Sequence, residues 1–128
     1  MAVTGTTTST ASLPLGNVSM FSGTVPANVT KTVNSTTSFD LSTPFDVRVD
    51  LANSASTTYT LAAMLSAAEA AGKVWTLGPT DISAGASHAM TSTGPYGSAV
   101  PYTLKLTIPA SAAAGSISNT INFTATAN

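Results

Sequence analysis

Polar and apolar residues alternate most clearly in the last quarter of the chain, residues 100–128. Every second residue of 102–108 is apolar, with threonine or lysine between them. Because the side chains of a β-strand point alternately to its two faces, this pattern predicts a strand with one buried face, which Pro109 ends. A second alternation over 117–123 predicts another strand, and the small residues 110–115 predict the turn of a hairpin between the two.

Earlier segments show the same alternation. Residues 45–51 predict a strand with one apolar and one charged face. The apolar face comprises Phe45, Val47, Val49 and Leu51, and the charged face comprises Asp46, Arg48 and Asp50. Further strands are expected around Tyr59 and through Trp75, whose indole is expected in the core. The alanine-rich residues 61–71 fit a short helix that ends at Gly72, as an alternative to a plain strand.

The composition restricts the class of protein before any motif is considered. The chain has 128 residues, no cysteine, four basic and five acidic residues, and a net charge of -1. This length suits one domain, in which we expect an extended N-terminal arm over residues 1–27 and a sandwich over residues 28–128. The few scattered basic residues argue against nucleic acid as a partner. No apolar run reaches the length of a membrane span, so membrane insertion is not expected, and the first residues lack the basic and apolar segments of a signal peptide.

A search for catalytic residues finds little that favours an enzyme. His88 is the only histidine, and its neighbour Ser87 would point to the opposite face of a strand, so these two do not form a nucleophile and base pair. Asp46 and Asp50 share a face but would lie about 13 Å apart, beyond the roughly 5 to 9.5 Å of paired glycosidase carboxylates. No metal-binding or phosphate-binding motif occurs. We therefore predict a non-enzymatic protein with no catalytic residues, no cofactor and no metal site.

Three segments together resemble a known class of domain. They read LANSASTTYTL, WTLGPTDISAGAS and YTLKLTIPASAAAGSISNTINFTATA, and they lie within the part of the chain from Phe45 to Ala127. In their strands and turns they resemble the immunoglobulin-like domains of bacterial and archaeal surface proteins and of tailed-phage virion proteins. The resemblance implies an all-β fold, an immunoglobulin-like antiparallel β-sandwich. It leaves the first third of the chain unmatched, and its motifs describe strands and turns rather than chemistry.

The expected function follows from the arm, the low charge and the scarcity of catalytic groups. We expect a structural protein of the virion surface, a phage capsid decoration (cement) subunit whose partners are its own copies or a major capsid protein. One alternative is a secreted pilus, filament or surface-layer subunit, extracellular or on the cell surface, that donates its arm as a strand to the next copy. A second alternative is a carbohydrate-binding module that presents Tyr59 or Tyr96 to a surface glycan. The candidate partner contacts are Leu13, Leu15, Val18, Met20, Phe21, Asp46, Arg48, Asp50 and Tyr96.

Overall fold

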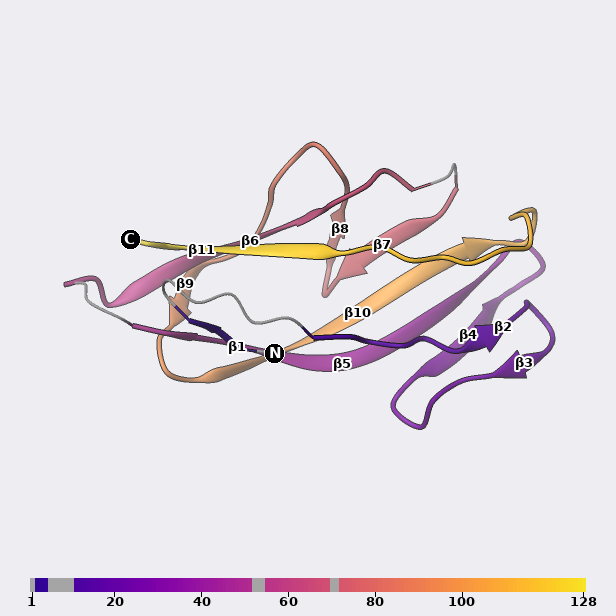
Figure 1. Ribbon diagram of the computed structural model, residues 1–128, viewed down its shortest axis with the longest axis horizontal. Coiled ribbons are helices and arrows are strands. Elements are labelled where there is room, and N and C mark those ends of the chain that lie inside the picture. Colours follow the sequence, from indigo (N-terminus) through magenta and orange to yellow (C-terminus); the bar gives the residue numbers. More distant parts are fainter. Residues whose placement is uncertain (1, 5–10, 52–54, 70–71) are drawn as a thin grey trace.

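Two β-sheets face each other across an apolar core, so the protein is an all-β sandwich (Figure 1). The computed structural model describes residues 2–4, 11–51, 55–69 and 72–128, and these residues contain no helix. The larger sheet consists of β1 (Ala2–Thr4), β4 (Thr30–Asn34), β5 (Ser38–Asp50), β10 (Ala99–Pro109), β7 (Val74–Leu77) and β8 (Thr80–Ile82). The smaller sheet has the order β11 (Ile121–Ala127), β6 (Thr58–Leu65), β9 (His88–Pro95). A separate ribbon pairs β2 (Asn17–Val18) with β3 (Gly23–Thr24).

The long antiparallel pair of β5 and β10 organises the larger sheet. Its register runs without interruption from Ser38 opposite Pro109 to Arg48 opposite Ala99. The alternation predicted for β10 is confirmed, because Leu104, Leu106 and Ile108 are buried and the strand ends at Pro109. On β5 the buried side chains are Phe39, Leu41, Thr43, Val47 and Val49. Leu51 departs from its predicted apolar face: it lies beyond the end of β5 and is 45% exposed.

The last two strands do not form the predicted hairpin. β10 pairs with β5 and β7 in the larger sheet, whereas β11 pairs with β6 in the smaller one. The physical reason lies in residues 110–120, which form a connection long enough to carry the chain from one sheet to the other. Ala112 and Ile117 of this connection pack against the core as it crosses. The chain therefore closes one end of the sandwich here instead of turning back on itself.

The described part of the alanine-rich segment, residues 61–69, contains a strand up to Leu65 and no helix, whereas residues 70–71 of the predicted helix lie outside the described residues. β6 continues through Leu65, and Tyr59, Leu61, Ala63 and Leu65 are all buried. This spacing of two residues places Tyr59, Leu61 and Leu65 on the core face, whereas a helix would scatter them around its circumference. Burial of that face outweighs the intrinsic helix preference of alanine. Ala63 is fully buried between the sheets, where its small side chain leaves room for the facing residues.

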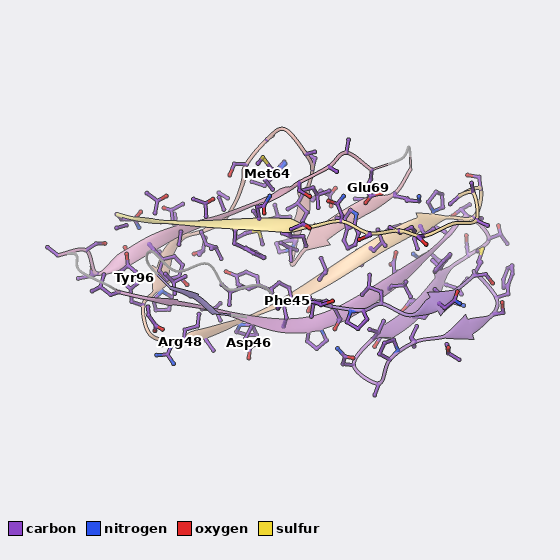
Figure 2. All side chains as sticks on the ribbon, in the orientation of Figure 1. Phe45, Asp46, Arg48, Met64, Glu69 and Tyr96 are labelled. Carbon is purple, nitrogen blue, oxygen red and sulfur yellow. The ribbon has the colours of Figure 1, made fainter. Side chains whose placement is uncertain are left out.

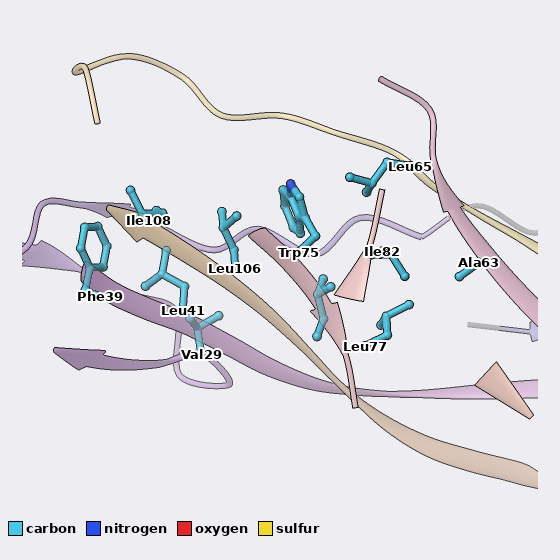
Figure 3. Packing of buried hydrophobic residues seen from close by; sticks show 11 residues of the cluster. Val29, Phe39, Leu41, Ala63, Leu65, Trp75, Leu77, Ile82, Leu106 and Ile108 are labelled. Atoms are coloured by element: carbon cyan, nitrogen blue, oxygen red, sulfur yellow. The ribbon is translucent and has the colours of Figure 1, made fainter. Parts of the chain in front are cut away.

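Side chains from both sheets meet in the core (Figure 3). Leu106 and Trp75 reach in from the larger sheet, and Leu65 and Ala63 from the smaller one. Trp75 is buried, as the sequence predicted. Its indole N–H donates a hydrogen bond of 3.0 Å to a carboxylate oxygen of Glu69, so the one polar atom of the ring is paired.

The described part of the N-terminal region lies against its own sandwich. β1 pairs with β5 in parallel, with Ala2 to Thr4 beside Arg48 to Asp50. In the view of Figure 1, the chain from residue 11 onwards runs between β5 and β11 and leads to the β2–β3 ribbon. Apolar side chains of this stretch, together with Val25, pack against the core cluster. Among the described residues, the region predicted as an extended arm thus covers the open side of the sandwich.

Candidate partner-binding surface

The β2–β3 ribbon carries the most exposed large apolar side chain of the described residues. Phe21, at the tip of the ribbon, is 81% exposed. Polar contacts fix the turn that presents it: the Ser19 N–H donates to the Ser22 carbonyl at 2.9 Å, and the two serine hydroxyls lie 2.7 Å apart. Lys31 of β4 ties the turn to the sandwich, because its Nζ donates to the Ser22 carbonyl at 3.2 Å. The ring is therefore held out in solvent by a turn with defined geometry.

Gly23 is required for this close ribbon. Its φ of +103° lies in the region that L side chains rarely adopt, and a Cβ there would lie 2.5 Å from the Cα of Val18 and overlap the Asn17 carbonyl. No other residue type allows the two short strands to approach this closely without a shift of backbone. The glycine therefore determines where Phe21 points.

Four other candidate contacts in the same region are not free surface residues. Leu13, Leu15, Val18 and Met20 are half-buried and pack against the core cluster of their own sandwich. Leu13 and Leu15 alternate with exposed neighbours, so this stretch places every second side chain inward. The structure thus separates Phe21 from four apolar residues that looked equivalent in the sequence.

The predicted charged face of β5 points outward. Figure 2 shows Asp46 and Arg48 on the outer side of the strand, with Phe45 directed towards the interior. Arg48 Nε donates to Asp50 Oδ1 at 2.7 Å, and the two side chains are 52% and 38% exposed. A pair this accessible to water contributes little to stability, typically below about 1 kcal/mol. These three residues remain accessible for a polar contact beside the strand pair of β1 and β5.

Tyr96 packs inward at the end of the sandwich, in the connection between β9 and β10. Its ring centroid lies 5.2 Å from that of Tyr59, with an angle of 54° between the planes. Tyr59 is 1% exposed, and among the described residues its hydroxyl has no hydrogen-bond partner. Burial, followed by the neighbouring Tyr102 and Tyr96 hydroxyls, raises the pKa of Tyr59 above its ordinary value of 10.0. These rings form an internal aromatic cluster and not a flat exposed platform.

His88 has a serine partner that the sequence did not reveal. Its Nε2 lies 2.9 Å from Ser83 Oγ, across the connection between β8 and β9. Ser87, the neighbour of His88 in the sequence, is exposed. Within the described ranges, no carboxylate hydrogen-bonds to His88 and no three His, Cys, Asp or Glu side chains gather in a way that would hold a metal ion. The pair is thus a surface contact that joins the two strands.

A polar cluster at one end of the sandwich was also missed. Asn119 Nδ2 donates to Glu69 Oε1 at 2.8 Å and to the Ala67 carbonyl at 2.9 Å. The same Glu69 oxygen accepts the hydrogen bond from Trp75. This carboxylate therefore joins the loop after β6, the connection before β11 and the core tryptophan. A lone Glu and a lone Asn far apart in sequence give no pattern from which this contact could be predicted.

The fold and these surfaces define an all-β sandwich protein with an exposed aromatic residue at a hairpin tip. In the part of the chain that the structure describes, no helix is long and apolar enough to cross a membrane. Comparisons with family models, with curated proteins and with solved structures find no match to this chain.

Proposed function

We propose that this chain is a non-enzymatic structural subunit that decorates the surface of a phage capsid, built on an immunoglobulin-like sandwich. The observation that carries the proposal is Phe21, an aromatic ring 81% exposed on a turn held by hydrogen bonds. Aromatic side chains that enter a pocket of a partner contribute most of the binding energy in many protein interfaces. Among the described residues Phe21 is the most exposed large apolar side chain, which fits such a role.

The surroundings of Phe21 also fit a contact with a protein shell. Ser19, Ser22 and Thr24 around the ring are exposed and uncharged, and they would form the polar rim that surrounds the apolar centre of an interface. Lys31 beneath the turn uses its ammonium group to hold the Ser22 carbonyl and lies 5.6 Å from the centre of the Phe39 ring. The turn is thus prepared before binding, which lowers the entropy lost when a partner is engaged.

The filament alternative is favoured by one separate observation. Ala2 to Thr4 add in parallel to the edge of β5, which is the geometry in which a strand from a neighbouring copy would be received. In the described structure this strand pairs with its own sandwich. The carbohydrate alternative loses its two proposed contacts, because Tyr59 is buried and Tyr96 packs against it.

The proposal is tested with virions of the phage that encodes the chain, purified with and without its reading frame. Recombinant wild-type protein, Phe21→Ser and a control, Val33→Ser, are each mixed with the particles that lack the chain, and binding is measured by co-sedimentation. Val33 is also an exposed apolar residue, 43% accessible on β4. Burial of a phenylalanine contributes about 2 kcal/mol, so Phe21→Ser should weaken binding about thirtyfold while the control binds as wild type.

Two results would oppose the proposal. If the chain is absent from purified virions and found in fibres sheared from cells, the filament alternative is correct. If Phe21→Ser binds the particles as tightly as wild type, the hairpin tip is not the attachment site. Deletion of the whole arm is a poorer test, because Leu13 and Leu15 cover the core and their loss would disturb folding.

A further inference from the structure

The outer edge of β11 is the longest sheet edge in the described structure without a feature that blocks strand pairing. Its sequence, Ile121 to Ala127, contains no charge and no proline, and its register with β6 shows no irregularity. β11 ends its sheet, so only one of its two sides is paired among the described strands. Unprotected edges of this kind are the surfaces on which a further strand adds.

The other edges carry protective features. β9, at the far side of the same sheet, has register shifts against β6 and ends in Gly94 and Pro95. In the larger sheet, β8 is three residues long and β4 carries Lys31. Short strands, bulges, prolines and lysines all disfavour pairing between molecules. Among the strands that the structure describes, β11 alone combines length with a neutral, regular backbone.

Hydrogen bonds at its two ends show which backbone groups of β11 face outward. Ser66 N–H donates to the Thr120 carbonyl at 2.9 Å, and Asn128 N–H donates to the Thr58 carbonyl at 3.1 Å. In an antiparallel pair the N–H and C=O of one residue face the same neighbour, and successive residues alternate. Even-numbered residues of β11 therefore face β6. The outward groups belong to Ile121, Phe123, Ala125 and Ala127.

We propose that this edge pairs with the same edge of a second copy, antiparallel, about a twofold axis at Thr124. This register is the one in which all of Ile121 to Ala127 overlap with the partner strand, and it matches outward-facing groups with outward-facing groups. It also sets Phe123 opposite Ala125 of the second copy, a large side chain against a small one. No charge occurs on either strand, so antiparallel pairing brings no like charges together.

The edge is held ready for this pairing at its C-terminal end. Asn128 Nδ2 donates to Thr58 Oγ1 at 2.9 Å and to the Ser92 carbonyl at 2.7 Å, and its Oδ1 accepts from Thr60 Oγ1 at 2.8 Å. These bonds fix β11 against both β6 and β9. A partner strand would therefore meet a straight, ordered edge and would extend the three-stranded sheet to six strands, with affinity supplied by main-chain hydrogen bonds.

A charge-swap experiment tests the pairing. Thr124 is exposed and would face its own copy across the axis, so Thr124→Lys and Thr124→Glu should each raise the dimer dissociation constant at least tenfold in sedimentation velocity. An equimolar mixture of the two variants should restore the dimer. Thr93→Lys places the same charge on β9, at the opposite edge, and should leave the dimer intact. Denaturation midpoints confirm that each variant is folded.

Ala125→Pro gives a second, uncharged test. Its N–H faces outward, so proline removes a donor to the partner while the bonds to β6 remain, and dimerisation should be lost in a folded protein. A wild-type protein that stays monomeric across the concentration series would overturn the pairing. So would an open-ended polymer, a dimer that Thr124→Lys leaves unchanged, or a mixture that fails to reassociate.

The choice of a second copy as the partner of β11 rests on the proposed function. The β11 pairing and the decoration role can nevertheless be refuted independently. Phe21→Ser reports on attachment to virions, and Thr124→Lys reports on pairing in solution. A dimer split by Thr124→Lys, in a chain absent from virions, would support the pairing and remove the decoration role. A monomer that still binds virions through Phe21 would support the decoration role and refute the pairing.

Discussion

Replacement of Gly94 by alanine is expected to destabilise the sandwich by about 3 kcal/mol, because the added methyl group would overlap a buried aromatic ring. Gly94 on β9 lies directly opposite Tyr59 on β6. A Cβ at Gly94 would overlap the Cζ and Cε2 atoms of Tyr59 and would lie 2.7 Å from Cε1. Carbon atoms in contact normally lie about 3.5 to 4.0 Å apart, so the ring would have to move.

The size of this loss of stability follows from how tightly the Tyr59 ring is packed. Tyr59 is 1% exposed and Tyr96 packs against it at a centroid distance of 5.2 Å, so a shift of the ring would push against other side chains. The backbone at Gly94 lies outside the left-handed region, so alanine adds no backbone strain there. Overpacking of a dense core costs about 1 to 3 kcal/mol, and the upper end applies here. For a chain of this size, about 3 kcal/mol corresponds to a decrease of about 10 °C in Tm.

The assay is chemical denaturation followed by the fluorescence of Trp75, the only tryptophan. The control is the same substitution in a Tyr59→Leu background, where the smaller side chain leaves room for the methyl group. There the cost of Gly94→Ala should fall below about 1 kcal/mol, which a double-mutant cycle measures as a coupling between the two sites. Equal costs in the two backgrounds, or an unchanged midpoint for the single variant, would refute the packing described for β6 and β9.

Three further predictions concern polar groups in or next to the core. Tyr59→Phe removes a buried hydroxyl that has no hydrogen-bond partner among the described residues. Chemical denaturation should therefore show an unchanged free energy of unfolding or a gain of about 1 kcal/mol. A clear loss of stability would mean that the hydroxyl forms a hydrogen bond. The raised pKa of Tyr59 keeps its hydroxyl protonated in the folded state at pH values where the unfolded state ionises. The contribution of Tyr59 to stability should therefore be complete below about pH 9 and be lost as the pH rises above about 10, so that stability falls there less steeply in Tyr59→Phe. Glu69→Ala leaves the Trp75 and Asn119 donors without their acceptor and should cost about 1 to 2 kcal/mol in the same assay, whereas Glu69→Gln, which keeps an oxygen, should cost less.

Alternation in the sequence predicted the strands well but not their neighbours. In β10 the burial of every second residue follows from side-chain geometry within one strand, so Leu104, Leu106 and Ile108 were identified correctly. Pairing depends instead on where each connection leads. Residues 110–120 and the turn at Tyr96 both carry the chain between sheets, and a small-residue turn looks the same in either case. The helix predicted over residues 61–71 was wrong in its described part, residues 61–69, for a related reason, since alanine favours helices locally while the sandwich buries Ala63.

The candidate partner contacts show the same limit of prediction from the sequence. Met20 and Phe21 are adjacent and both apolar, yet only Phe21 is largely exposed. Which of the two faces solvent is decided by the tight ribbon around Gly23, a tertiary feature that hydropathy does not contain. The outward direction of Asp46 and Arg48, by contrast, follows from alternation with buried Val47 and was predictable. Sequence thus identifies which residues could bind a partner, and the fold selects among them.

The two proposed contacts use different parts of the molecule and therefore do not compete. Phe21 lies on the β2–β3 ribbon, which Figure 1 shows at the opposite end of the long axis from the chain terminus that follows β11. A pair of copies joined through β11 would carry two such rings, one on the β2–β3 ribbon of each copy. Engagement of the first ring would then hold the second near the same surface, and the effective concentration gained in this way strengthens attachment without any new contact. A subunit with few charges would gain from that arrangement, because its individual contacts receive little long-range electrostatic attraction.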